Sequence, residues 1–131
     1  MSDSIICARS FEFAVRIIDL CARLYYCGPA ARQVASQLLR CGTAIGANAE
    51  EAQDGQTKPD SIAKMSVSRK ESRETKYWLR LAISSRVVTA EQIAWEVNEA
   101  TELRRMITRR FEPHSQIPIE AIPTPDPNCC P

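Results

Sequence analysis

The sequence predicts an all-α fold, an antiparallel up-down bundle of four helices. Apolar residues recur at intervals of three and four through most of the first 110 residues, the spacing of helices that bury one face. The chain has 4 Gly, and most of its 8 Pro lie in the last twenty residues, so long segments have no helix breaker. Short polar or Gly/Pro-containing segments separate four periodic runs, which favours helices that pack beside one another in chain order.

The chain divides into a bundle at residues 1–111 and a tail at residues 112–131. A chain of 131 residues is long enough to bury a core as one domain. The tail, EPHSQIPIEAIPTPDPNCCP, has a Pro every few residues and no apolar periodicity. We expect it to be extended or disordered.

The first predicted helix spans residues 10–26, with Ser10 as its N-cap. It has two apolar faces and only a narrow charged stripe. One face consists of Phe11, Val15, Ile18, Ala22 and Tyr25. The other consists of Phe13, Ile17, Leu20 and Leu24. A four-helix core covers one of them, so we assign the second set to an interface between subunits.

The second predicted helix spans residues 31–52. Its inward stripe consists of Val34, Leu38, Cys41 and Ile45, continued by Asn48 and Ala49. Gly42 and Gly46 are small and permit close approach of a neighbouring helix. An inward Asn48 needs hydrogen-bond partners.

The third predicted helix, at residues 59–85, has two contrasting faces. Thr57 or Lys58 precedes Pro59, which is tolerated in a first turn. The expected core arc consists of Val67, Trp78, Leu81 and Ala82. Nearly opposite lies a basic stripe of Arg69, Arg73, Lys76 and Arg80. Leu79 and Ile83 form a side stripe, which we add to the candidate subunit interface.

Glu71 and Glu74 project with the apolar arc of this helix. Inward carboxylates are costly unless they are paired, so we predict a polar cluster with Asn48, with Arg40 or Arg104 as partner. The alternative is a metal site of the kind that carboxylate-lined bundles hold, but such sites also use histidines. The one histidine, His114, lies in the tail. The sequence therefore predicts no metal and no cofactor.

The fourth predicted helix spans residues 90–110. Thr89 and Gln92 have the spacing of a capping box. Its inward set consists of Ile93, Val97, Ala100, Leu103 and Ile107.

Composition favours a cytoplasmic protein. The N-terminus has no basic and apolar signal segment, and no apolar run approaches a membrane span. Six cysteines have no C-x-x-C spacing, so we interpret them as reduced thiols. They are Cys7, Cys21, Cys27, Cys41, Cys129 and Cys130. Without a histidine in the helices no nucleophilic triad can be assembled, and no phosphate-binding glycine loop is present. We therefore expect no enzyme.

Three segments resemble one known family. They are QLLRCGTAIGANAEEA, SVSRKESRETKYWLRLA and EATELRRMI. Over about residues 9–110 the chain is similar to the four helix bundle proteins, also called 23S ribosomal RNA intervening-sequence or S23 proteins. The corresponding positions include Arg40, Ile45, Asn48 and Glu74, whereas the family's Ala-Glu-Gly appears here as Ala-Glu-Glu.

The resemblance implies a left-handed bundle that assembles into a ring-shaped homo-oligomer, a homopentamer. Some members are encoded within intervening sequences of bacterial ribosomal RNA genes. A related group serves as accessory proteins to reverse transcriptases in diversity-generating retroelements, and binds the enzyme and nucleic acid. The resemblance implies no enzymatic activity.

The basic stripe is the surface feature that points to a function. Net charge is +1, but residues 59–88 carry seven basic and three acidic side chains. The stripe covers about 16 Å of helix, a length suited to several phosphates, and few aromatic residues flank it. We therefore expect binding of RNA or DNA through the phosphate backbone, more readily RNA. The alternative is a scaffold whose stripe binds an acidic partner protein, for example a reverse transcriptase.

Overall fold

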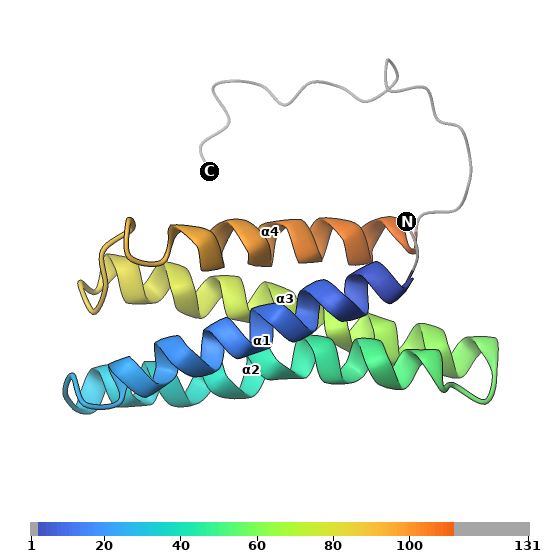
Figure 1. The fold of residues 1–131 in the computed structure, drawn as a ribbon, viewed down its shortest axis with the longest axis horizontal. Coiled ribbons are helices and arrows are strands. Elements are labelled where there is room, and N and C mark those ends of the chain that lie inside the picture. Colours follow the sequence, from blue (N-terminus) through green and yellow to red (C-terminus); the bar gives the residue numbers. More distant parts are fainter. Residues whose placement is uncertain (1–2, 112–131) are drawn as a thin grey trace, which may run out of the picture.

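The computed structural model describes residues 3–111, which fold into four α-helices with no strand among them. They are α1 (Asp3–Leu24), α2 (Pro29–Gln53), α3 (Lys58–Ser84) and α4 (Ala94–Arg109). Figure 1 shows each helix returning beside the preceding one, and α4 packs against both α3 and α1. The all-α prediction with four helices is confirmed. The predicted tail at residues 112–131, with Cys129 and Cys130, lies outside the described residues.

Two helix starts follow from side-chain caps that the sequence indicates. The Thr57 hydroxyl accepts a hydrogen bond from the Asp60 backbone N–H at 3.2 Å. The Thr89 backbone N–H donates to the Gln92 side-chain oxygen at 2.9 Å. The Gln92 backbone N–H donates to the Thr89 hydroxyl at 3.3 Å, which completes the capping box. The regular α-helix nevertheless begins only at Ala94, after a turn.

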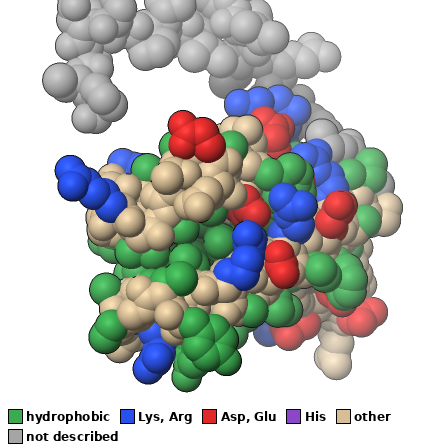
Figure 2. Space-filling model, turned by 60° about the vertical axis from the view of Figure 1, so that its left-hand side comes forward, with side chains coloured by type: hydrophobic (Ala, Val, Ile, Leu, Met, Phe, Trp, Pro, Cys, Tyr) green, Lys and Arg blue, Asp and Glu red, His purple; other side chains and the backbone are tan. Residues whose placement is uncertain are grey.

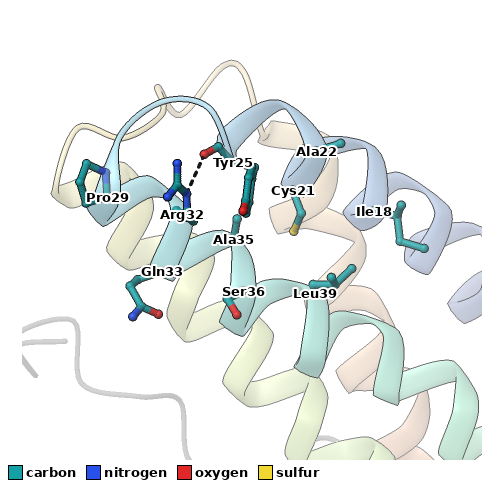
Figure 3. Close-up of a pocket in the computed structure, with 10 residues that line it drawn as sticks. All are labelled: Ile18, Cys21, Ala22, Tyr25, Pro29, Arg32, Gln33, Ala35, Ser36 and Leu39. Atoms are coloured by element: carbon teal, nitrogen blue, oxygen red, sulfur yellow. Dashed lines mark hydrogen bonds between the residues drawn. The ribbon is translucent and has the colours of Figure 1, made fainter.

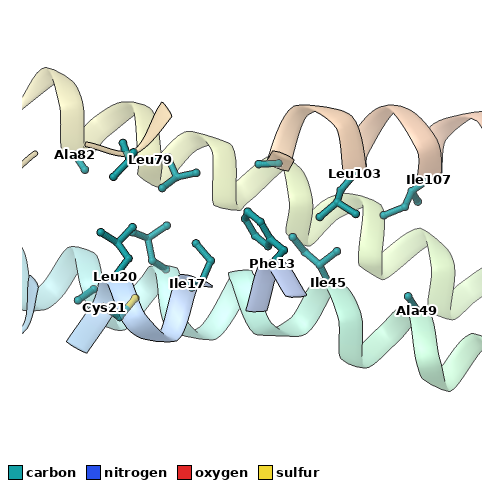
Figure 4. Packing of buried hydrophobic residues seen from close by; sticks show 14 of the residues in the cluster. Phe13, Ile17, Leu20, Cys21, Ile45, Ala49, Leu79, Ala82, Leu103 and Ile107 are labelled. Atoms are coloured by element: carbon teal, nitrogen blue, oxygen red, sulfur yellow. The ribbon is translucent and has the colours of Figure 1, made fainter. Parts of the chain in front are cut away.

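Helix α1 begins seven residues before the predicted N-cap. Ser10 is fully buried within the helix, and its hydroxyl donates to the Cys7 carbonyl at 3.1 Å. The earlier start adds Ile6 and Ser10 to the face of Phe13, so that one face is buried at spacings of three and four. Its members are Ile6, Ser10, Phe13, Ile17, Leu20 and Leu24. Figure 4 shows part of this row packed against α2, α3 and α4.

The inward faces predicted for α2 and α4 are confirmed, except that Asn48 and Val97 are half-buried. Gly42 brings α1 and α2 together, because a Cβ placed there would lie 2.8 Å from Ile17 Cγ2. Gly46 likewise faces Ser10. Small residues on α2 therefore set the close approach of α1.

Helix α3 buries hydroxyl side chains where we predicted large apolar ones. Ser68, Ser72 and Thr75 are fully buried, whereas Val67 and Leu81 are exposed. The Ser68 hydroxyl donates across to the Ile45 carbonyl of α2 at 2.7 Å. Ser72 and Thr75 donate to carbonyls of their own helix at 2.6 and 2.7 Å. Because these hydroxyls are satisfied, they can occupy the core face, and the predicted arc was wrong by about a third of a turn.

Two further features bear on function. Within residues 3–111, no cluster of His, Cys, Asp and Glu is placed to hold a metal ion. None of the four helices is both long and apolar enough to cross a bilayer.

Candidate nucleic-acid interface

The basic stripe of α3 lies on the side of the helix that faces α4 and solvent. Arg73 and Arg80 are exposed, whereas Arg69 and Lys76 are half-buried. The Arg69 guanidinium carbon lies 4.8 Å from the centroid of the Phe111 ring, a cation–π contact. Arg69 is therefore held beside the C-terminal end of α4, and the other three basic side chains follow it along α3.

A groove of about 340 Å³ runs between α3 and α4 beside this stripe. All the charged residues that line it are basic, and the rest are threonines. They are Lys76, Thr101, Arg104, Arg105, Thr108 and Arg109. Of these, Arg105 is paired at 3.3 Å with Glu102 one turn earlier on α4. The stripe and the groove together form what we call the α3–α4 basic surface.

This surface is basic because the acids near the start of α4 are directed to α1. Arg9 binds both carboxylate oxygens of Glu99 at 2.8 Å, a bidentate pair. Arg16 lies 3.7 Å from the buried carboxylate of Glu96. Figure 2 shows acidic and basic side chains intermixed over one half of a face whose other half is mainly hydrophobic. Glu96 and Glu99 are thus neutralised by α1, and Glu102 is the one acid of α4 that pairs with an arginine of the groove.

Glu71 and Glu74 are held by Arg40 at the edge between α2 and α3. Arg40 pairs with Glu74, and its Nη1 lies 3.5 Å from Glu71 Oε2. Trp78 Nε1 also donates to Glu74, at 3.3 Å. Burial and repulsion by Glu74 raise the pKa of Glu71. The Asn48 amide donates to the Ala44 carbonyl of its own helix at 2.9 Å.

The predicted polar cluster is thereby corrected. Its two glutamates are grouped, with Arg40 as their partner, but they lie half-buried at a helix edge, and the hydrogen bond of Asn48 stays within α2. The edge faces away from the α3–α4 basic surface. Two of the three acids of α3 are therefore removed from that surface.

Sequence reasoning missed the contribution of α4. Arg104 was one of two predicted partners for Glu71 or Glu74, and it lies in the groove instead, with Lys76. Arg105 and Arg109 were not considered. The available signal was the basic run RRMITRR, which a short α3–α4 connection brings alongside the middle of α3.

The residues predicted at the subunit interface belong to the core of the single chain. Phe13, Ile17, Leu20, Leu24 and Leu79 are buried, with at most 4% exposure. Ile83 is half-buried and packs against the same core. The prediction was wrong because α1 buries this face, which Ile6 and Ser10 extend toward the N-terminus, and leaves its other apolar face exposed.

The other face of α1 is exposed. Its large apolar members are 49–64% accessible. They are Phe11, Val15, Ile18 and Tyr25. Ile18 and Tyr25 also line an open groove of about 660 Å³ between α1 and α2 (Figure 3). At its end, Arg32 Nε donates to the Tyr25 carbonyl at 3.3 Å, and the Arg32 guanidinium covers the Tyr25 ring.

Comparison with known proteins agrees with this architecture. A family model described as 23S rRNA-intervening sequence protein matches residues 2–109. A crystal structure of a protein of unknown function from the S23 ribosomal protein family of Bacteroides thetaiotaomicron VPI-5482 is similar, with 37% identity and a TM-score of 0.76. The match covers 84% of this chain and 97% of that one. No curated protein matches the chain.

Proposed function

Because the chain belongs to the family of 23S rRNA-intervening sequence proteins, we propose that it is a non-enzymatic, homo-oligomeric RNA-binding protein. The α3–α4 basic surface binds the phosphate backbone. One observation carries the proposal, the groove in which every charged lining residue is Lys or Arg.

The chemistry of the groove suits phosphate. Arg104, Arg105 and Arg109 offer planar donors that bind phosphate oxygens in pairs, and Lys76 offers a point charge. The hydroxyl of Thr108 is a further donor of the kind found at nucleic-acid backbones, whereas that of Thr101 already donates to the Val97 carbonyl at 2.9 Å. Such contacts place a strand without reading its sequence, so binding is expected to be largely independent of base order.

Self-association is proposed through the apolar α1 face together with the α1–α2 groove. Two exposed side chains of α1, Ile18 and Tyr25, continue across the groove to Leu39 of α2. A surface of this kind, rimmed by charged residues, is typical of subunit contacts. A ring, as in the homopentamer that the family resemblance implies, would repeat the basic surface and strengthen its field.

Charge reversal tests the RNA proposal. We expect Arg73→Glu with Arg80→Glu to weaken binding of a mixed-sequence RNA about tenfold or more at low salt, since phosphate contacts supply most non-specific affinity. The slope of log affinity against log salt should fall by about 0.7 for each phosphate of a single strand that the variant no longer neutralises. Fluorescence anisotropy with a labelled RNA measures both quantities.

Arg23→Glu with Lys64→Glu is the matched control, because it makes the same charge change on other surfaces. It should leave the affinity near that of the wild type. If the wild-type protein bound no RNA at low salt, the proposal would be refuted. Binding of an acidic protein without RNA binding would favour the scaffold alternative.

A further inference from the structure

Tyr77 places an exposed aromatic ring on the outer face of α3, at the edge of the basic stripe. Its side chain is 54% exposed. Arg73 lies four residues before it and Arg80 three residues after it, and both are exposed. At these spacings the side chains are neighbours on the helix surface.

The ring is supported from beneath by Trp78. The two ring centroids are 5.4 Å apart at an interplanar angle of 79°, an edge-to-face contact. Trp78 is itself half-buried, packs against the core and donates to Glu74. Tyr77 therefore rests on a fixed neighbour while much of its surface faces solvent.

Tyr77 also borders the track of positive charge. At about 100° per residue, Arg73 and Arg80 lie between Tyr77 and Lys76 around the helix. Lys76 lines the groove with α4. The order across the surface is therefore an aromatic ring, then two exposed arginines, then the basic groove.

From this order we infer that the nucleic acid bound here is single-stranded RNA, with an unpaired base stacked on Tyr77. The phosphates next to that base lie against Arg73 and Arg80 and continue toward the groove. Proteins that hold single strands combine a basic track with aromatic platforms, whereas the base faces in a duplex are already stacked and inaccessible. This inference rests on the proposed RNA-binding function and specifies its substrate class.

The test compares a single-stranded RNA of mixed sequence with a duplex of equal length, using the full-length protein. Tyr77→Ala should weaken single-strand binding about fivefold or more, the range for removing one stacked base. It should leave duplex binding unchanged. Tyr77→Phe keeps the ring and should keep the affinity. Tyr26→Ala removes another exposed tyrosine, 84% accessible at the α1–α2 turn, and should have no effect.

Two outcomes separate this inference from the function on which it rests. If Tyr77→Ala bound single strands as tightly as the wild type while Arg73→Glu with Arg80→Glu did not, stacking would be refuted and backbone binding would stand. A wild-type preference for the duplex would also refute the inference. If the wild type bound neither RNA, the proposed function itself would fail. Circular dichroism of each variant verifies that the helices are intact.

Discussion

Arg40 of α2 holds two carboxylates that stand one turn apart on α3. Glu74 accepts from Arg40 and from Trp78, and Glu71 Oε2 is buried with no hydrogen bond among the described residues. Burial first, and repulsion by Glu74 second, raise the pKa of Glu71. An acid whose pKa is raised on folding disfavours the folded state increasingly as the pH rises through that pKa. Arg40 opposes this effect by pairing with the ionised form.

Replacing Arg40 by Met should therefore destabilise the protein in a pH-dependent way. The loss of stability is expected to grow as the pH rises through the raised pKa of Glu71, because its ionised carboxylate then depends on the charge of Arg40, and to shrink at acidic pH, where Glu71 is protonated. Thermal unfolding at several pH values measures it. Arg23→Met removes an exposed pair with Asp19 and should change the melting temperature little at any pH. A loss of stability that did not change with pH would contradict the electrostatic role of Arg40 and indicate that packing of its alkyl chain matters instead.

The cysteines also act at the scale of single residues. Cys7, Cys21, Cys27 and Cys41 are free, as predicted. Burial, with a smaller effect of Cys41, raises the pKa of Cys21 to about 11, and burial also raises that of Cys41. Both thiols therefore remain protonated near neutral pH, which suits small core residues rather than nucleophiles.

At the scale of helices, the sequence predicted the four helices more accurately than it predicted which face of each helix is buried. The inward sets of α2 and α4 were predictable because Val, Leu and Ile dominate them at regular spacing. In α1 the predicted cap at Ser10 left Ile6 outside the helix, so the buried face could not be recognised as the longer of the two apolar rows. In α3 the core positions hold Ser68, Ser72 and Thr75, whose hydroxyls find carbonyl acceptors that composition does not reveal. The basic stripe could be predicted from residue spacing within α3. The groove could not, because most of its lining comes from α4, and spacing within one helix does not show which side chains of another helix lie beside it.

The contact between α1 and α2 provides a test at this scale. Gly42→Ala would place a Cβ 2.8 Å from Cγ2 and 3.1 Å from Cγ1 of Ile17, a buried β-branched residue with little room to move. Overpacking should lower the free energy of unfolding by about 1–3 kcal/mol, although Ala is favoured over Gly in helices by about 1 kcal/mol. Denaturant unfolding measures the difference.

The same substitution in an Ile17→Ala background is the control. With the isoleucine side chain removed, the added methyl group has space, and the cost of Gly42→Ala should disappear. If Gly42→Ala still destabilised the protein in the Ile17→Ala background, the contact with Ile17 would not be the source of the strain.

At the scale of the molecule, two surfaces of opposite character lie on different helix pairs. The α3–α4 basic surface carries the proposed RNA site, and the apolar α1 face carries the proposed self-association. Because the two do not share helices, a ring could use one surface for assembly and leave the other exposed. Phe11, Val15 and Ile18 of the apolar α1 face are each more than half exposed in the single chain.

Substitutions at two adjacent residues of α1 distinguish an effect on self-association from an effect on folding. Ile18 is 51% exposed and Ile17 is fully buried. Ile18→Asp should yield a folded monomer of 14.7 kDa by light scattering, with unchanged helix content. Ile17→Asp buries an unpaired charge and should cost about 3 kcal/mol or more in stability. A wild-type protein that was already monomeric at working concentration would contradict the proposed assembly.

The bidentate pair between Arg9 and Glu99 spans ninety positions of the chain. During synthesis the N-terminal helices emerge first, and α4 is made last. Until α4 docks, its acids are not neutralised by α1 and its arginines are not beside Lys76. The groove of the α3–α4 basic surface is therefore expected to form only when the bundle closes, after the exposed arginines of α3 have already been made.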